Sequence, residues 1–228
     1  MSPLPDLRLA ILGTDTDVGK TWVTGALIQG LRALGQRVWV HKPVACGEWD
    51  GASAADGRTL RGWCGDGQDP VTVCPHEFPE ACSPHLAAAL AGVHLGLTDL
   101  VQAVPQPPVA THLVLETAGG LLAPLTEDRL TNADLVAALG WSALVVTRPH
   151  LGTLNHTQLT VNEARRRGIR VLGLVVNHHS PATGHAVETA PAELAALTGL
   201  PVLAVMRQGD QGGAALAAAL LALHTKPS

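Results

Sequence analysis

Short apolar runs alternate with longer stretches of helical periodicity along most of the chain. The apolar runs have no polar face, which is typical of parallel strands buried between helices. The runs expected to form strands are residues 7–12, 37–41, 112–116, 143–147, 171–176 and 201–205. The stretches expected to form helices are residues 19–34, 83–90, 131–140, 152–167, 192–197 and 214–224, with a further helix start near residue 98. The alternation predicts an α/β fold in which helices cover both faces of a doubly wound, mostly parallel sheet.

Nothing in the composition divides the chain, so residues 1–228 are expected to form one α/β domain. Residues 48–82 are rich in Gly, Asp and Pro, and a long, partly helical connection is expected there. Hydrophobic residues make up 46% of the chain, which is enough for a sizeable core. With no Tyr and a single Phe, that core must consist mainly of Leu, Val and Ala.

Charge and targeting signals argue against several classes of protein. The net charge of −4, without a long basic run, disfavours nucleic acid as the main partner. No apolar stretch of about 20 residues predicts a membrane span. The N-terminus lacks the pattern of a signal peptide, so a cytoplasmic location is expected. The four cysteines form no Cys-x-x-Cys, which disfavours a zinc site and a disulfide framework.

A candidate phosphate-binding loop, Gly13–Thr21, lies between the first strand and the first helix. Gly19 would let the backbone approach a phosphate, Lys20 would reach the terminal phosphates, and the Thr21 hydroxyl would bind Mg²⁺. Five residues separate Gly13 from Gly19, where the usual pattern has four. The alternative is a glycine-rich turn that happens to contain a lysine. The strand before the loop and the helix after it favour nucleotide binding and a P-loop NTPase-like fold.

Further candidates follow other strands, at the sheet edge where ligands of such folds gather. Glu116 ends an apolar strand and could bind Mg²⁺, or it could cap a neighbouring loop. Asp56 is a second metal candidate, although a solvated loop aspartate is the default. Lys42 could stabilise a transferring phosphoryl group, or it could be an ordinary solvated lysine. The helix start at residues 152–155 could bind an anion, and ordinary capping is equally compatible with the sequence.

Five stretches, in this order, resemble the dethiobiotin synthetase family: Gly13–Thr21, Lys42–Gly47, Ser83–His85, Glu116–Gly120 with Pro124 and Leu125, and Leu151–His156. The resemblance implies an ATP- and Mg²⁺-dependent ligase that carboxylates 7,8-diaminononanoate with CO₂ through a carbamate. The carbamate attacks the γ-phosphate of ATP, and the second amine then closes the ureido ring. The family is a homodimer, so a homodimer is expected here, with no nucleic acid or membrane partner.

The resemblance also implies residue roles. Lys20 and Lys42 would be catalytic, and Mg²⁺ would be bound by Thr21, Asp56 and Glu116. Cys46 would lie near the substrate, whose carboxylate would bind the partner's helix start, Gly152, Thr153, Leu154 and Asn155. The remaining nucleotide contacts would come from Asp17, Val18, Gly19, Trp22, Thr117, Ala118, Gly119, Asn177, His178, Arg207, Gln208 and Gly209.

The sequence departs from the family pattern at three places. Thr117 stands where the family usually has Gly, and Cys46 stands where it often has a small hydroxyl residue. Residues 205–209 lack the proline common in the loop beside the adenine. Cys46 donates a hydrogen bond less well than Ser or Thr, which bears on the substrate contact, and the missing proline bears on the preference for ATP.

Two other functions remain open. A nucleotide-dependent switch of the partition or localisation type would share the fold, but such switches usually have an extra lysine in the loop. Residues 15–18 contain none, and residues 214–224 form no basic amphipathic stretch. A related amide-forming synthetase would need a glutaminase domain, for which 228 residues leave no room.

Overall fold

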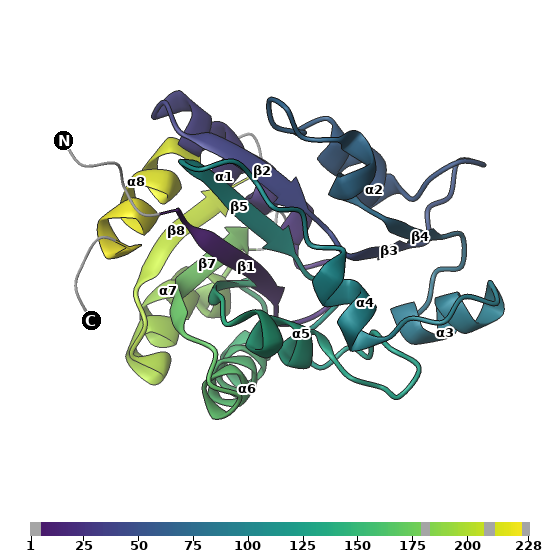
Figure 1. Cartoon of the computed structure of the whole chain (residues 1–228). Helices are drawn as coiled ribbons and strands as arrows, with labels where there is room; N and C mark the ends of the chain where they lie inside the picture. Colours follow the sequence, from purple (N-terminus) through teal and green to yellow (C-terminus); the bar gives the residue numbers. More distant parts are fainter. Residues whose placement is uncertain (1–5, 179–182, 208–212, 225–228) are drawn as a thin grey trace.

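A six-stranded, fully parallel sheet forms the centre of the computed structural model, which describes residues 6–178, 183–207 and 213–224 (Figure 1). The strand order is β2-β5-β1-β6-β7-β8. The strands are β1 (Arg8–Gly13), β2 (Arg37–His41), β5 (Thr111–Glu116), β6 (Ser142–Thr147), β7 (Val171–His178) and β8 (Val202–Arg207). Each of the six expected strands is confirmed. The apolar runs of β1, β2, β5, β6 and β7 are buried on both faces of the sheet, whereas the edge strand β8 is mostly only partly buried.

Helices cover both faces of this sheet, as the alternation of elements predicts (Figure 1). On one face, α1 (Lys20–Ala33) and α8 (Gly213–His224) pack Leu27 and Leu216 into the core. On the other, α5 (Asn132–Leu139), α6 (Thr153–Arg166) and α7 (His185–Thr198) contribute Val136, Val161 and Leu194. The chain leaves β1 toward β2 on one side of it, whereas the later strands β6, β7 and β8 are added on the other side. The loop after β1 therefore lies at the switch point where α/β folds bind ligands.

A smaller layer stands beside the main sheet. It contains the parallel pair β3 (Val44–Cys46) and β4 (His76–Phe78), with α2 (Ala55–Arg61), the 3₁₀ turn Pro70–Val73, α3 (Pro84–Leu90) and α4 (Leu97–Gln102). Residues 48–82 therefore have more structure than the partly helical connection expected from the sequence. Three-residue strands are too short to show a periodicity, which is why the sequence does not reveal them.

Helix α7 is longer than predicted. The sequence predicts a helix over 192–197, whereas α7 begins at His185 and continues through Pro191. Proline removes one backbone donor and normally ends a helix. Here Ala190 and Leu194 on either side of it are buried, so packing against the sheet offsets the lost hydrogen bond.

The outer edge of β2 is covered by a side chain. The Gln68 amide donates to the Val40 carbonyl at 2.6 Å, and its oxygen accepts from the Val40 N–H at 3.2 Å. The same oxygen accepts from the Gly65 N–H. Gln68 thus occupies the position of a neighbouring strand.

Within the described ranges, no helix combines the length and the apolarity that a bilayer crossing requires.

Candidate active site

The loop after β1 has a conformation that requires glycine at its end. Gly19 caps α1 with φ +86°, and a Cβ at this position would lie 1.9 Å from the Asn177 amide nitrogen. That nitrogen donates to the Val18 carbonyl at 2.9 Å. Asn177 of strand β7 therefore fixes the end of the loop. The backbone N–H groups at the start of α1 point to the edge of the sheet where the strands end, and an anion can bind there.

Lys20 lies across this loop. Its side chain is only 6% exposed, and its Nζ donates to the Asp15 carbonyl at 3.2 Å. Burial, followed by the neighbouring Lys42 ammonium, lowers the pKa of Lys20 to about 8. A lysine so held adds a positive charge at the place where the terminal phosphates of a nucleotide would lie.

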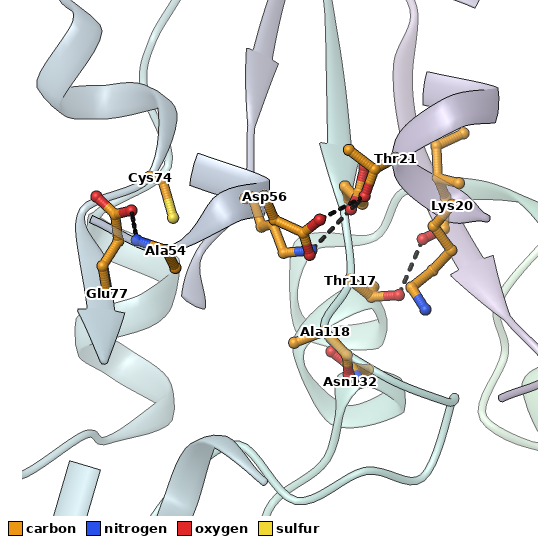
Figure 2. Close-up of polar contacts among 12 residues, drawn as sticks. Lys20, Thr21, Ala54, Asp56, Cys74, Glu77, Thr117, Ala118 and Asn132 are labelled. Atoms are coloured by element: carbon orange, nitrogen blue, oxygen red, sulfur yellow. Dashed lines mark hydrogen bonds and ion pairs between the residues drawn. The ribbon is translucent and has the colours of Figure 1, made fainter. Parts of the chain in front are cut away.

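Four side chains from four segments meet beside the loop, and we call Thr21, Lys42, Asp56 and Glu116 the rim cluster. Figure 2 labels Thr21 and Asp56 of this cluster. The Thr21 hydroxyl lies 2.9 Å from an Asp56 oxygen and 2.7 Å from Glu116 Oε1. The Lys42 Nζ donates to Glu116 Oε1 at 2.7 Å and to Asp56 Oδ2 at 2.5 Å. Lys42 follows β2, Glu116 ends β5 and Asp56 lies in the first turn of α2.

The charges of the rim cluster stabilise one another. Lys42 is 3% exposed and Glu116 is fully buried. Burial alone would lower the pKa of Lys42, but the carboxylates of Glu116 and Asp56 outweigh it and raise this pKa above its usual value. Burial would likewise raise the pKa of Asp56, but Lys42 outweighs it and keeps this pKa lowered. Near neutral pH, Lys42 is therefore an ammonium and Asp56 a carboxylate.

The oxygens of the rim cluster suit Mg²⁺. The hydroxyl of Thr21 and the carboxylates of Asp56 and Glu116 converge, and Glu116 Oε2 is buried without a hydrogen-bond partner among the described residues. No group of three His, Cys, Asp or Glu side chains in the described part of the chain could hold a metal by itself. Mg²⁺ commonly takes only one or two protein carboxylates and completes its shell with water and nucleotide phosphates, so these residues fit that ion.

The segment after Glu116 is fixed from both sides. The Thr117 hydroxyl donates to the Ile11 carbonyl of β1 at 2.9 Å. The amide nitrogen of buried Asn132 donates to the carbonyls of Ala118 at 2.7 Å and Gly120 at 2.8 Å (Figure 2). The sequence does not reveal this role of Asn132, because residues 131–134 show only the signal of a helix start. It holds the 117–120 segment against the phosphate-binding loop.

Comparison with known proteins relates this arrangement to one family. The model AAA_26, described as an AAA domain, matches residues 8–213. The chain is 44% identical to the ATP-dependent dethiobiotin synthetase BioD of Anaeromyxobacter sp. (strain K), over 83% of this chain and 85% of that protein. It is 37% identical to the BioD of Bacillus licheniformis, over 86% of this chain and 83% of that protein. This chain belongs to the dethiobiotin synthetase family.

Solved structures show that this dethiobiotin synthetase family member has the P-loop NTPase fold predicted from the sequence. A MinD complexed with Mg-ADP from Pyrococcus horikoshii OT3 superposes with a TM-score of 0.56 at 16% identity, covering 96% of this chain and 94% of that one. A ParA family ATPase from Chlorobium tepidum TLS gives 0.53 at 8% identity, covering 97% and 98%. At such identities the likeness concerns the fold alone.

Other residues that the family resemblance singles out lie at the ends of strands β3, β7 and β8 and at the start of α1. Cys46 ends β3 and is partly buried, and burial raises the pKa of its thiol to about 12, so it stays uncharged. His178 ends β7 and Arg207 ends β8. Trp22 lies in the first turn of α1 and is 39% exposed. Gln208 and Gly209 lie outside the described residues.

The helix start at residues 152–155 is tied to the phosphate-binding loop. The Thr153 hydroxyl is buried and bonds that of Thr147 at 2.8 Å, and the Thr14 hydroxyl donates to Thr147 at 3.3 Å. Gly152 and Asn155 are exposed on the surface, whereas Leu154 packs toward the core. An incoming anion could therefore meet the backbone of this turn and the Asn155 side chain, but not the Thr153 hydroxyl.

We expect the affinity for ATP to fall as the pH rises above about 8. Nucleotide phosphates favour the ammonium form of Lys20, whose pKa in the free protein is about 8. Above that pH, binding must take up a proton, and the association constant falls by up to about tenfold per pH unit. Isothermal titration calorimetry in two buffers of different ionisation enthalpy measures the uptake directly. Binding near pH 9 without proton uptake would contradict this role of Lys20.

Proposed function

We propose that this chain is an ATP-dependent ligase of biotin biosynthesis that forms dethiobiotin from 7,8-diaminononanoate and CO₂. The observation that carries the proposal is the rim cluster, which places the Lys42 ammonium beside the phosphate-binding loop. ATP hydrolysis alone would not require a second buried lysine, Lys42, paired with two carboxylates.

The reaction proceeds in three steps. One amine of the substrate adds to CO₂ and loses a proton, which gives a carbamate. A carbamate oxygen then attacks the γ-phosphorus of ATP, so that ADP leaves and a carbamic-phosphoric anhydride forms. Finally the second amine attacks the carbonyl carbon of this anhydride, loses a proton and expels phosphate, which closes the ureido ring.

Lys20 and Lys42 neutralise the charge that builds up in the second step. Two of the three N–H groups of Lys42 donate to Asp56 and Glu116, and the third can donate to the carbamate or to the phosphoryl group. Lys20 faces the same phosphates from the loop. Fixed cations in a buried site lower the barrier for phosphoryl transfer because they need no reorganisation. Mg²⁺ bound by Thr21, Asp56 and Glu116 would add positive charge at the β- and γ-phosphates.

The adenine is proposed to lie near Asn177, His178 and Arg207 at the ends of β7 and β8. The amide nitrogen of Asn177 already donates to Val18, and its Oδ1 is buried without a partner among the described residues. An amide oxygen so placed can accept from the 6-amino group of adenine, whereas guanine presents an oxygen there. This supports a preference for ATP.

The active site is proposed to be completed by a second copy of the chain in a cytoplasmic homodimer, with Cys46 beside the diamine. The substrate carboxylate would bind the partner's turn at residues 152–155, where an exposed helix start offers backbone N–H groups.

Replacing Gly152 by Glu tests this substrate site. We expect the KM for the diamine to rise about tenfold or more while the KM for ATP changes less than about twofold, because the new carboxylate repels the substrate carboxylate. Gly152 has φ +95°, so the matched control is Gly152→Ala, which adds the same backbone strain without charge. Equal effects of the two substitutions, or equal losses for both ligands, would contradict the assignment.

A direct assay tests the overall function. The purified protein is mixed with 7,8-diaminononanoate, bicarbonate and Mg-ATP, and ADP and dethiobiotin are quantified. We expect both products only when the diamine is present. ADP release that ignores the diamine would favour the alternative, a nucleotide-dependent switch, whose fold MinD and ParA represent.

A further inference from the structure

We infer that Glu77 is a positioning residue that sets the place of Asp56 in the rim cluster; the inference rests on the proposed Mg²⁺ role of Asp56. Glu77 lies in β4, opposite Ala45 of β3, and has no contact with the phosphate-binding loop among the interactions of the described residues. It acts on helix α2, whose first turn contains Asp56.

Glu77 binds the N-cap backbone of α2 and the side chain of the last residue of the helix. Its Oε2 accepts from the N–H of Ala54, the N-cap residue of the helix, at 3.0 Å (Figure 2). Its Oε1 is ion-paired with the guanidinium of Arg61, the last residue of the helix. A single carboxylate beside Gly57 thus joins the N-cap backbone of α2 to the side chain of the last helical residue. The side chain of Glu77 is only 12% exposed.

The helix leaves a place for this carboxylate. Ala54 has no side chain to cap the helix, and the third helical position, where a capping box would have Glu or Gln, is Gly57. A Cβ on Gly57 would lie 2.1 Å from Glu77 Oε2. Glu77 of β4 therefore supplies the capping carboxylate that helix α2 lacks. The absence of a side chain at Gly57 lets this carboxylate approach the helix.

Asp56 needs such support. A seven-residue helix is marginal by itself, and 46% of the Asp56 side chain is exposed. Lys42 is also close to this small sheet along the chain, because β3 begins two residues later, at Val44. Through β3 and through Glu77 on β4, this sheet sets the positions of Lys42 and Asp56 relative to one another. Residues that orient a metal ligand typically change metal affinity by about 10- to 100-fold when they are replaced.

The test measures metal binding as well as turnover. Mn²⁺ serves as the probe, and its binding in the presence of ADP is followed by electron paramagnetic resonance. For Glu77→Ala we expect Mn²⁺ affinity to fall about 10-fold or more and the half-saturating Mg²⁺ concentration for turnover to rise in parallel. ADP affinity in EDTA should stay within about twofold of wild type, because the phosphate-binding loop is untouched. Glu77→Gln, which keeps an acceptor for the Ala54 N–H, should lose less.

Two matched variants make the outcome decisive. Glu80→Ala removes an exposed glutamate three residues away and should behave like wild type. Asp56→Asn removes the proposed ligand and should lose Mn²⁺ affinity. If Asp56→Asn loses affinity and both Glu77 variants bind like wild type, the positioning role is overturned while the proposed function stands. If Asp56→Asn also binds like wild type, the metal role of Asp56 fails, and the positioning role fails with it. If circular dichroism shows that Glu77→Ala does not fold, Glu77→Gln decides.

Discussion

Replacing Lys42 by glutamine is expected to lower kcat for dethiobiotin formation by about 1,000-fold. Lys42 is buried in the rim cluster and kept protonated by Glu116 and Asp56, so it presents a fixed positive charge to the transferring phosphoryl group. Glutamine has a similar length and can still donate a hydrogen bond, but it cannot neutralise that charge. Steady-state kinetics with saturating diamine and Mg-ATP give the value. Near-normal turnover would reject the catalytic role.

The stability of the Lys42→Gln variant must be measured as well as its turnover, because a solvated lysine could be replaced without loss of stability but a buried one could not. The structure adds that Lys42 neutralises Glu116, which is fully buried. Removing the cation leaves that carboxylate uncompensated, which typically costs about 3 kcal/mol. Urea denaturation should show this loss in Lys42→Gln and partial recovery in the double variant with Glu116→Gln. A double variant that folds as well as wild type and is still inactive would separate catalysis from stability.

Replacing Gly19 by alanine is expected to weaken ATP binding by about 100-fold, equivalent to about 3 kcal/mol. The left-handed conformation disfavours any Cβ by about 1 kcal/mol. In addition, this Cβ would lie 1.9 Å from the Asn177 amide. The amide must move, the Val18 carbonyl loses its donor, and the loop shifts away from the phosphates. Isothermal titration calorimetry with ATP measures the change.

Gly35 provides the matched control. It also has a positive φ, +73°, but a Cβ there would meet nothing within 4 Å. Gly35→Ala should therefore lower the free energy of unfolding by about 1 kcal/mol and leave ATP affinity unchanged. If the two alanine variants bound ATP equally well, the close contact with Asn177 would have no role in shaping the loop.

Local sequence signals were sufficient for the main sheet and the phosphate-binding loop. Residues 9–12 are all apolar and lead directly into the loop, so strand, loop and helix could be placed from neighbours alone. Asp56 is different: its surroundings make a solvated loop aspartate the default, and the resemblance to a family was needed to favour a metal role. What makes it part of the rim cluster is a hydrogen bond to Thr21, 35 positions away in the sequence.

Residues that act through long-range contacts left no local signal. Asn132 reads as part of a helix start, and Glu77 reads as a polar residue in a loop. Asn132 binds the backbone carbonyl of Ala118, and Glu77 binds the backbone N–H of Ala54. Backbone acceptors and donors are the same for every residue type except proline, so no sequence pattern marks such a pair.

The Gln68 amide on the outer edge of β2 bears on the tendency of the protein to aggregate at high concentration. Unpaired backbone groups on an outermost strand invite strands of other molecules to add, which leads to aggregation. At Val40 both of those groups are already engaged by the side chain. A molecule built this way can be abundant in a crowded solution without recruiting its neighbours at that position.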